Sequence, residues 1–213
     1  MSRMLVVYYS WSNGNTKRIA EQLARRTGAD IARIETVQPY TGSYDEVVDQ
    51  GQREVNEGYR PPIQPLGVNV ADYDVIAVGT PTWWYTMAPA VLTFLEGKDF
   101  TGKTVIPFMT NGGWPGHVLR DMKKACRGAQ FACEMEVKFD SQGGDHLETP
   151  QTELDGTGEE NFRITGSYER LIMLRPQDFP AAVLHECDNS GGLAEPAREN
   201  TGLFSKSDPC YTF

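Results

Sequence analysis

A run of small polar residues after Tyr9 is the part of the sequence best suited to bind a ligand. It follows an apolar, β-prone run, Leu5–Tyr9, and precedes a helical apolar pattern that begins at Ile19. The start of a helix leaves backbone N–H groups unpaired and carries partial positive charge, so such a loop favours an anion, most naturally a phosphate. Helix capping is the alternative, but it needs only one such residue and a glycine. The loop residues are Ser10, Trp11, Ser12, Asn13, Gly14, Asn15 and Thr16.

A second candidate segment holds three adjacent aromatic residues after the predicted strand Val75–Gly79. We expect one of the two tryptophans to pack in the core. Two adjacent large side chains cannot easily both face inward, so at least one aromatic ring should line a crevice and offer a stacking platform to a planar ligand. This predicted loop consists of Thr80, Pro81, Thr82, Trp83, Trp84 and Tyr85.

A third candidate segment follows the predicted strand Thr104–Met109 and contains two adjacent glycines. A plain turn into the next helix is the alternative. Adjacent glycines also let backbone amides approach a flat ligand closely. The residues are Thr110, Asn111, Gly112 and Gly113.

Other motifs carry less weight. Residues 97–104 match the P-loop pattern, but a predicted helix precedes them and a strand follows, the reverse of what an ATP site needs. Asp145 and His146 are expected in a surface turn, with a ligand contact as the alternative. His117 and His185 stand alone and show no metal-ligand spacing, so no metal site is predicted.

Strands and helices alternate along the first 155 residues. This rhythm predicts an α/β fold, a doubly wound, five-stranded parallel sheet with helices on both faces. The three candidate segments then meet at the carboxyl edge of the sheet, where such folds bind ligands. Residues 58–74, rich in proline, are expected to be an extended connection. The predicted strands are Leu5–Tyr9, Ile31–Ile34, Val75–Gly79, Thr104–Met109 and Phe131–Phe139, and the predicted helices are Asn15–Thr27, Tyr44–Glu57, Pro89–Leu95 and Val118–Cys126.

The first loop resembles the phosphate loop of flavodoxins, the small FMN-binding electron carriers, whose pattern is Ser/Thr-x-Ser/Thr-Gly-x-Thr. The copy here, Ser10–Thr16, is one residue longer, with Asn13 before Gly14. Residues 80–85 and 110–113 resemble the two flavin-ring loops of that family. The resemblance covers about residues 1–155. It implies strand order 2-1-3-4-5, one non-covalent FMN with its phosphate on the first loop and its ring between the other two, and no catalytic side chain.

Electron transfer is therefore the expected function. An NAD(P)H-dependent FMN quinone reductase on the same fold is the alternative from the enzyme class, and a flavodoxin-shaped interaction module without cofactor is a third. The net charge of −9 argues against nucleic acid and favours redox partner proteins with basic docking surfaces. The four cysteines are expected to be reduced thiols in a cytoplasmic protein, and no apolar run reaches the length of a membrane span.

The remaining residues, 156–213, show no sustained hydrophobic period. Short apolar islands alternate with glycine, proline and charged residues. The sequence therefore predicts an irregular C-terminal tail, poorly ordered or accessory, after a flavodoxin-like domain of residues 1–155.

Overall fold

The structure, a computed structural model, describes residues 3–155. The predicted tail, 156–213, lies outside the described residues. The strands are β1 Met4–Tyr8, β2 Asp30–Arg33, β3 Val75–Trp83, β4 Thr86–Met87, β5 Thr104–Asn111, β6 Gln130–Phe131 and β7 Met135–Lys138. The helices are α1 Asn15–Thr27, α2 Tyr44–Glu57, α3 Pro89–Glu96, α4 Val118–Ala125 and α5 Gln151–Asp155, with a short 3₁₀ turn at Val70–Asp72.

The sheet has the strand order β2-β1-β3-β5-β6, and β7 also pairs with β5. All of these pairings are parallel. Strand β1 lies inside the sheet, where Val6 is opposite Ile31 of β2 and Ala77 of β3. The predicted doubly wound parallel sheet is therefore confirmed, and its order corresponds to 2-1-3-4-5 when β6 and β7 are counted as the fifth strand.

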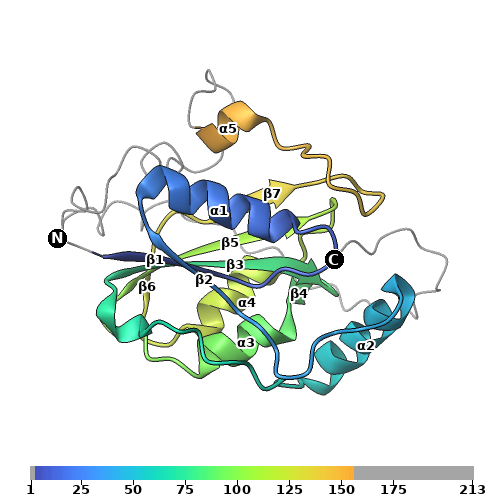
Figure 1. Ribbon diagram of the computed structural model, residues 1–213, viewed down its shortest axis with the longest axis horizontal. Coiled ribbons are helices and arrows are strands. Elements are labelled where there is room, and N and C mark those ends of the chain that lie inside the picture. Colours follow the sequence, from blue (N-terminus) through green and yellow to red (C-terminus); the bar gives the residue numbers. More distant parts are fainter. Residues whose placement is uncertain (1–2, 156–213) are drawn as a thin grey trace, which may run out of the picture.

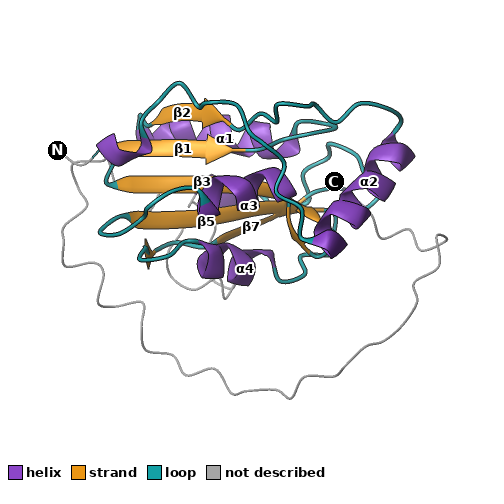
Figure 2. Cartoon of the chain, turned by 90° about the horizontal axis from the view of Figure 1, so that it is seen from below, coloured by secondary structure: helices purple, strands orange, loops and turns teal. Residues whose placement is uncertain are grey.

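Helices cover both faces of this sheet (Figures 1 and 2). Alternate residues of β1 point to opposite faces, as a strand requires. Val6 packs with Ile19 and Leu23 of α1 on one face, and Leu5 belongs to the cluster of α3 and α4 on the other. This two-sided burial explains why the run from Met4 to Tyr8 is apolar without interruption.

Helices α1 and α2 have the bounds that the sequence predicts. Each ends at a glycine in the left-handed conformation, Gly28 and Gly58. At the start of α2, Ser43 and Glu46 form a reciprocal capping box. Of the helices within residues 3–155, none has the length and hydropathy needed to cross a membrane.

The predicted strand ends were wrong by one residue in β1 and β2 and by more than one residue at three places. Strand β3 continues to Trp83 and β5 to Asn111, so residues 80–83 and 110–111 are strand and not loop. The predicted fifth strand is divided into β6 and β7, with Cys133 between them at a φ of 55°. Buried and exposed residues alternate along β7.

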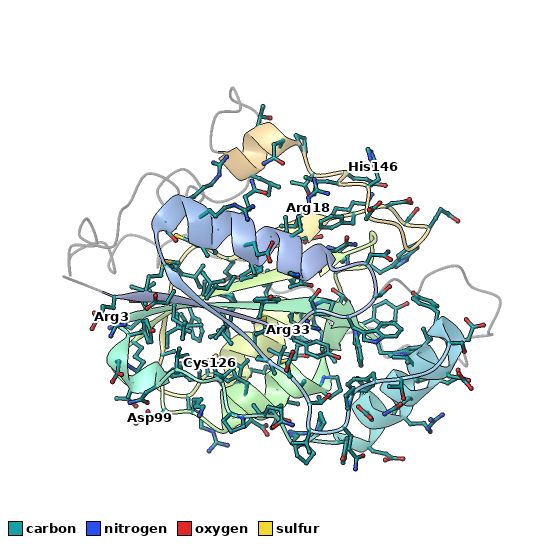
Figure 3. The ribbon with its side chains drawn as sticks, in the orientation of Figure 1. Arg3, Arg18, Arg33, Asp99, Cys126 and His146 are labelled. Carbon is teal, nitrogen blue, oxygen red and sulfur yellow. The ribbon has the colours of Figure 1, made fainter. Side chains whose placement is uncertain are left out.

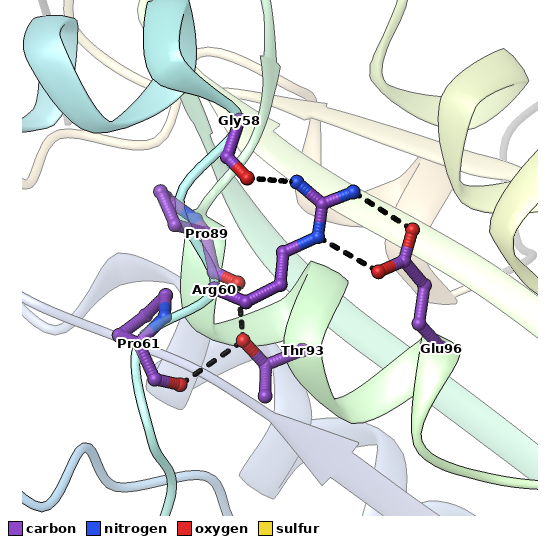
Figure 4. A network of polar contacts seen from close by, with 6 residues as sticks. All are labelled: Gly58, Arg60, Pro61, Pro89, Thr93 and Glu96. Carbon is purple, nitrogen blue, oxygen red and sulfur yellow. Dashed lines mark hydrogen bonds and ion pairs between the residues drawn. The ribbon is translucent and has the colours of Figure 1, made fainter.

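The connection from α2 to β3, residues 58–74, is largely extended, as predicted, and contains one 3₁₀ turn. Arg60 fixes it to α3 (Figure 4). Its Nε and Nη2 atoms donate to the two carboxylate oxygens of Glu96 at 2.7 and 2.9 Å, and Nη1 donates to Gly58 O. Nearby, Thr93 Oγ1 donates to Pro61 O at 3.0 Å. The P-loop-like residues 97–104 follow α3 and lead into β5, the order that excludes a phosphate site there.

We expect Glu96→Gln to lower the free energy of unfolding at pH 7 by at most about 1 kcal/mol, because both partners are well exposed. The Arg60 hydrogen bonds lower the pKa of Glu96. Its stabilisation is therefore present above the unfolded pKa of about 4.3 and is lost as the pH falls through the lower folded pKa. Urea unfolding at several pH values should show the two proteins converging below about pH 4. If the difference in the free energy of unfolding between the two proteins stayed constant down to pH 2, the stabilisation would not come from the ionised carboxylate of Glu96.

Candidate functional site

The first predicted loop connects β1 to α1 and brings backbone N–H groups to one point. Gly14 is the N-cap of α1 at a φ of 76°, and a glycine has no side chain that could cap the helix. Ser12 is also left-handed, at a φ of 57°. The first helical hydrogen bond runs from Arg18 N to Gly14 O at 2.9 Å, so the N–H groups of residues 15–17 have no acceptor within the helix. The loop leaves these donors available to an anion.

A cavity of about 650 Å³ lies against this loop. Its walls are the loop, α1 and the end of β2, and they bring three cationic side chains together against the single carboxylate of Glu21. The cations are Lys17, Arg18 and Arg33, and the loop contributes residues 10–14. Arg33 also donates to Ser10 O at 3.2 Å. The charge of the walls and the helix start favour an anionic ligand.

Two buried polar atoms of residues 10–16 lack hydrogen-bond partners within the described residues. Ser10 is 5% exposed, and its Oγ atom makes no hydrogen bond. The buried Oδ1 of Asn15 also accepts none. A buried polar atom without a partner costs about 1 to 3 kcal/mol, so both atoms indicate a ligand that would satisfy them.

The second predicted segment, residues 80–85, is a hairpin. Trp83 pairs with Thr86 of β4, and the two turn residues between them, Trp84 and Tyr85, have φ values of 49° and 64°. This is the two-residue, left-handed turn that suits a tight hairpin. Its strand residues are buried, and the Thr80 hydroxyl accepts from Ala88 N at 3.0 Å and donates to Pro81 O at 2.9 Å. Within residues 80–85, only the turn residues Trp84 and Tyr85 are partly exposed.

The two tryptophans have different environments. Trp83 is fully buried, with its ring edge-to-face against Tyr40 at 5.0 Å and Tyr9 at 5.8 Å between centroids. Burial and the hydrogen bond to Glu54 raise the pKa of Tyr40, so its hydroxyl stays protonated. Trp84 is partly exposed and donates from Nε1 to Val48 O at 3.1 Å. The prediction that one tryptophan packs in the core is confirmed for Trp83.

The third predicted segment contacts the first directly. Thr110 Oγ1 lies 2.8 Å from Thr16 Oγ1, and this hydrogen bond is buried. Asn111 Oδ1 accepts from Gly113 N at 2.6 Å and so shapes the glycine turn. The cavity itself is lined by the first loop, α1 and β2; within the described residues, its walls include none from 80–85 or 110–113. The structure thus joins the first and third segments while placing the cavity at the first.

Sequence reasoning missed two interactions. Residues 140–146 form a turn, here called the 140–146 turn, that docks on the first loop (Figure 3). Asn13 Nδ2 donates to Gly143 O, Asn15 Nδ2 to Gly144 O at 3.0 Å, and Arg18 to Asp145 O at 3.2 Å. The sequence did contain an indication of this docking. Residues 140–146 follow the last strand, and the carboxyl end of that strand lies at the same edge of the sheet as the first loop.

The second missed interaction pairs His117 with Asp121, so the interpretation of His117 as an isolated residue was wrong. His117 Nδ1 is hydrogen-bonded to Asp121 Oδ2, which also accepts from Thr86 Oγ1 at 2.8 Å. His117 N donates to Tyr85 O at 2.8 Å. These bonds fix the start of α4 to the hairpin. Across residues 3–155 no group of three or more potential ligands could hold a metal ion, and His185 lies outside that range.

Comparison with known proteins gives consistent results. The family model described as flavodoxin matches residues 3–148. A flavoprotein crystal structure from Bacteroides eggerthii DSM 20697 is 33% identical, with a TM-score of 0.59, and the match covers 66% of this chain and 91% of that one. One from Bacteroides uniformis ATCC 8492 is 26% identical, with a TM-score of 0.58 and coverage of 65% and 92%. A flavoprotein in complex with FMN from Lactobacillus acidophilus NCFM shares the fold at 20% identity, with a TM-score of 0.56 and coverage of 64% and 93%.

Proposed function

The chain belongs to the flavodoxin family, and from that premise we propose that it binds one FMN non-covalently and transfers electrons through it. The observation that carries the proposal is Ser10 Oγ, a buried hydroxyl without a partner among the described residues, beside a cation-lined cavity at the start of α1. A phosphate there would accept from Ser10 and from the loop amides, and Arg33 and Lys17 would offset its charge. The residues present fit the phosphate.

The flavin ring would lie at the second and third segments. Trp84 and Tyr85 at the hairpin turn offer partly exposed aromatic surface, and Gly112 offers its backbone in the glycine turn, where the Gly113 amide already donates to Asn111 Oδ1. FMN supplies the redox chemistry when it is bound, while the protein binds and orients it and shields it from water. The full predicted set, residues 10–16, 80–85 and 110–113, stays the proposed cofactor site. Residues 80–83 belong to it as the buried end of β3 that carries the hairpin turn.

The net charge of −9 supports redox partner proteins with basic docking surfaces. Cys126 and Cys133 are free thiols, and burial raises the pKa of Cys126 to about 12. Free thiols support a reducing, cytoplasmic compartment. Steady oxidation of NAD(P)H with a quinone, catalysed by the FMN-bound protein, would assign the alternative reductase function; its absence, together with reversible flavin reduction, would assign the carrier.

The test is a titration of the full chain with FMN and with riboflavin, which lacks the phosphate, followed by visible absorbance and gel filtration. We expect FMN to co-elute with the protein and Ser10→Ala to weaken FMN roughly 10- to 100-fold, since hydrogen bonds to charged groups contribute about 1.5 to 3 kcal/mol. Riboflavin binding should not change in that variant. Thr41→Ala is the control, because it also removes a hydroxyl, but from an exposed residue outside the cavity walls. A protein that binds no flavin would sink the proposal.

A further inference from the structure

A row of ring contacts runs from the surface of the protein into its interior. We call it the aromatic chain, and its members are Tyr44, Trp11, Trp83 and Tyr40. The rings of Tyr44 and Trp11 are stacked with their centroids 6.0 Å apart, and Trp11 lies edge-to-face against Trp83 at 6.4 Å. Trp83 in turn lies edge-to-face against Tyr40 at 5.0 Å. Tyr44 is 37% exposed and Tyr40 only 9%, so the aromatic chain connects solvent with a buried phenol.

The phenol at the inner end of the aromatic chain is hydrogen-bonded to a buried carboxylate. Tyr40 Oη donates to Glu54 Oε2, and Gln50 Nε2 donates to Glu54 Oε1 at 2.7 Å. Because both carboxylate oxygens accept hydrogen bonds, Glu54 has the pattern of the ionised group. Burial and the bond to Glu54 raise the pKa of Tyr40, so the proton between them lies on the phenol.

This pair lets Tyr40 lose an electron without becoming a cation. An oxidised phenol is strongly acidic, and an uncompensated positive charge inside a protein is costly. If the phenolic proton moves to Glu54 as the electron leaves, the products are a neutral tyrosyl radical and a neutral carboxylic acid. The pair then loses its negative charge, which burial favours.

We propose that the Tyr40–Glu54 pair is a redox site of the protein itself, which a one-electron oxidant at the surface reaches through the aromatic chain. The oxidant takes one electron from an outer ring, Tyr44 or Trp11, and Trp83 replaces that electron. Tyr40 then gives an electron to Trp83 while its proton moves to Glu54 Oε2. One electron leaves the protein for the oxidant, and the proton stays within the pair. The site uses no flavin, so the inference goes beyond the proposed function.

Tyr73 provides a matched control with similar chemistry at another place. Its hydroxyl donates to the carboxylate of Asp30 at 2.8 Å, and the residue is 4% exposed. Tyr73 precedes the nine-residue strand β3, whereas Trp83 is the last residue of that strand. Tyr73 and Asp30 therefore form a phenol–carboxylate pair at the far end of β3 from Trp83.

The experiment oxidises the full chain with a ruthenium(III) tris-bipyridine complex generated by a laser flash, and transient absorbance follows the tryptophan and tyrosyl radicals. We expect a tryptophan radical to form first and to convert to a tyrosyl radical, more slowly in heavy water because a proton moves with the electron. Glu54→Gln should slow this conversion roughly 100-fold, because a positioned base contributes that much or more to a proton transfer. Tyr40→Phe should abolish the conversion, and Tyr73→Phe should leave it unchanged.

Trp11→Leu tests the path, since it removes the ring between Tyr44 and Trp83 and should lower the yield of the tyrosyl radical. A conversion that is as fast in heavy water as in ordinary water would overturn the proposal, and this comparison needs no variant. A tyrosyl radical that persists in Tyr40→Phe and disappears in Tyr73→Phe would overturn it as well. None of these results depends on whether the protein binds FMN.

Discussion

Gly116→Ala should destabilise the protein by about 3 kcal/mol, combining a left-handed backbone with overpacking. Gly116 has a φ of 60°, and an added Cβ would lie 2.2 Å from Tyr85 O and 2.5 Å from Tyr85 Cα. Both are backbone atoms of the hairpin turn, so no rotation of a side chain can relieve the contact. The clash would separate the start of α4 from the hairpin and break the bond from His117 N to Tyr85 O.

Gly102→Ala is the control for this prediction. Gly102 is also left-handed, at a φ of 74°, but nothing lies within 4 Å of the added Cβ. Gly102→Ala should lower the free energy of unfolding by only about 1 kcal/mol, because alanine is less stable than glycine in a left-handed backbone conformation. Urea unfolding followed by tryptophan fluorescence reports on this part of the chain, because all four tryptophans lie within residues 11–114. Equal midpoints for the two variants would show that the contact with Tyr85 relaxes freely.

Trp83→Ala should cost about 3 to 5 kcal/mol, the range for removing a large buried aromatic side chain. The Trp83 side chain is fully buried among Tyr9, Tyr40 and Trp11. Its removal leaves a cavity between the sheet and the start of the first loop, and the ring contacts of three neighbours are lost with it. Thermal unfolding by circular dichroism measures the effect without relying on the deleted fluorophore.

Trp84→Ala is the comparison for Trp83→Ala, because both variants remove the same type of side chain. Trp84 lies at the hairpin turn, partly exposed, and its Nε1 donates to Val48 O at 3.1 Å. Trp84→Ala should therefore cost about 1 to 2 kcal/mol, a hydrogen bond and part of a buried surface. A larger loss for Trp84 than for Trp83 would contradict the assignment of Trp83 to the core.

Local signals explain how far the fold could be predicted. Helices α1 and α2 were predicted to the residue because each has a periodic apolar face and ends at a left-handed glycine. The ends of β3 and β5 were not predicted, because Thr80, Thr82 and Thr110 are polar and yet buried. The hydroxyls of Thr82 and Thr110 find partners far along the chain, in Met109 and Thr16. Such partners leave no trace in the local sequence.

The same reason divides the candidate site into predictable and unpredictable parts. The first loop was correctly predicted as a loop, because its residue types describe a helix start by themselves. The docking of the 140–146 turn on Asn13 and Asn15 depends on residues about 130 positions apart, and only the topology brings them together. The break at Cys133 had no local signal either. A left-handed backbone is usually indicated by a glycine in the sequence, and here the left-handed residue is a cysteine.

That break has a consequence for how the protein behaves among its own copies. A long, regular edge strand is a template for pairing with another chain, and natural sheets protect against this with short strands, bends and charges. The β5 side of this sheet ends in strands of two and four residues separated by a kink, and the opposite edge is the four-residue β2, which carries Asp30 and Arg33. Both edges of the described sheet are thus poor starting points for aggregation between copies.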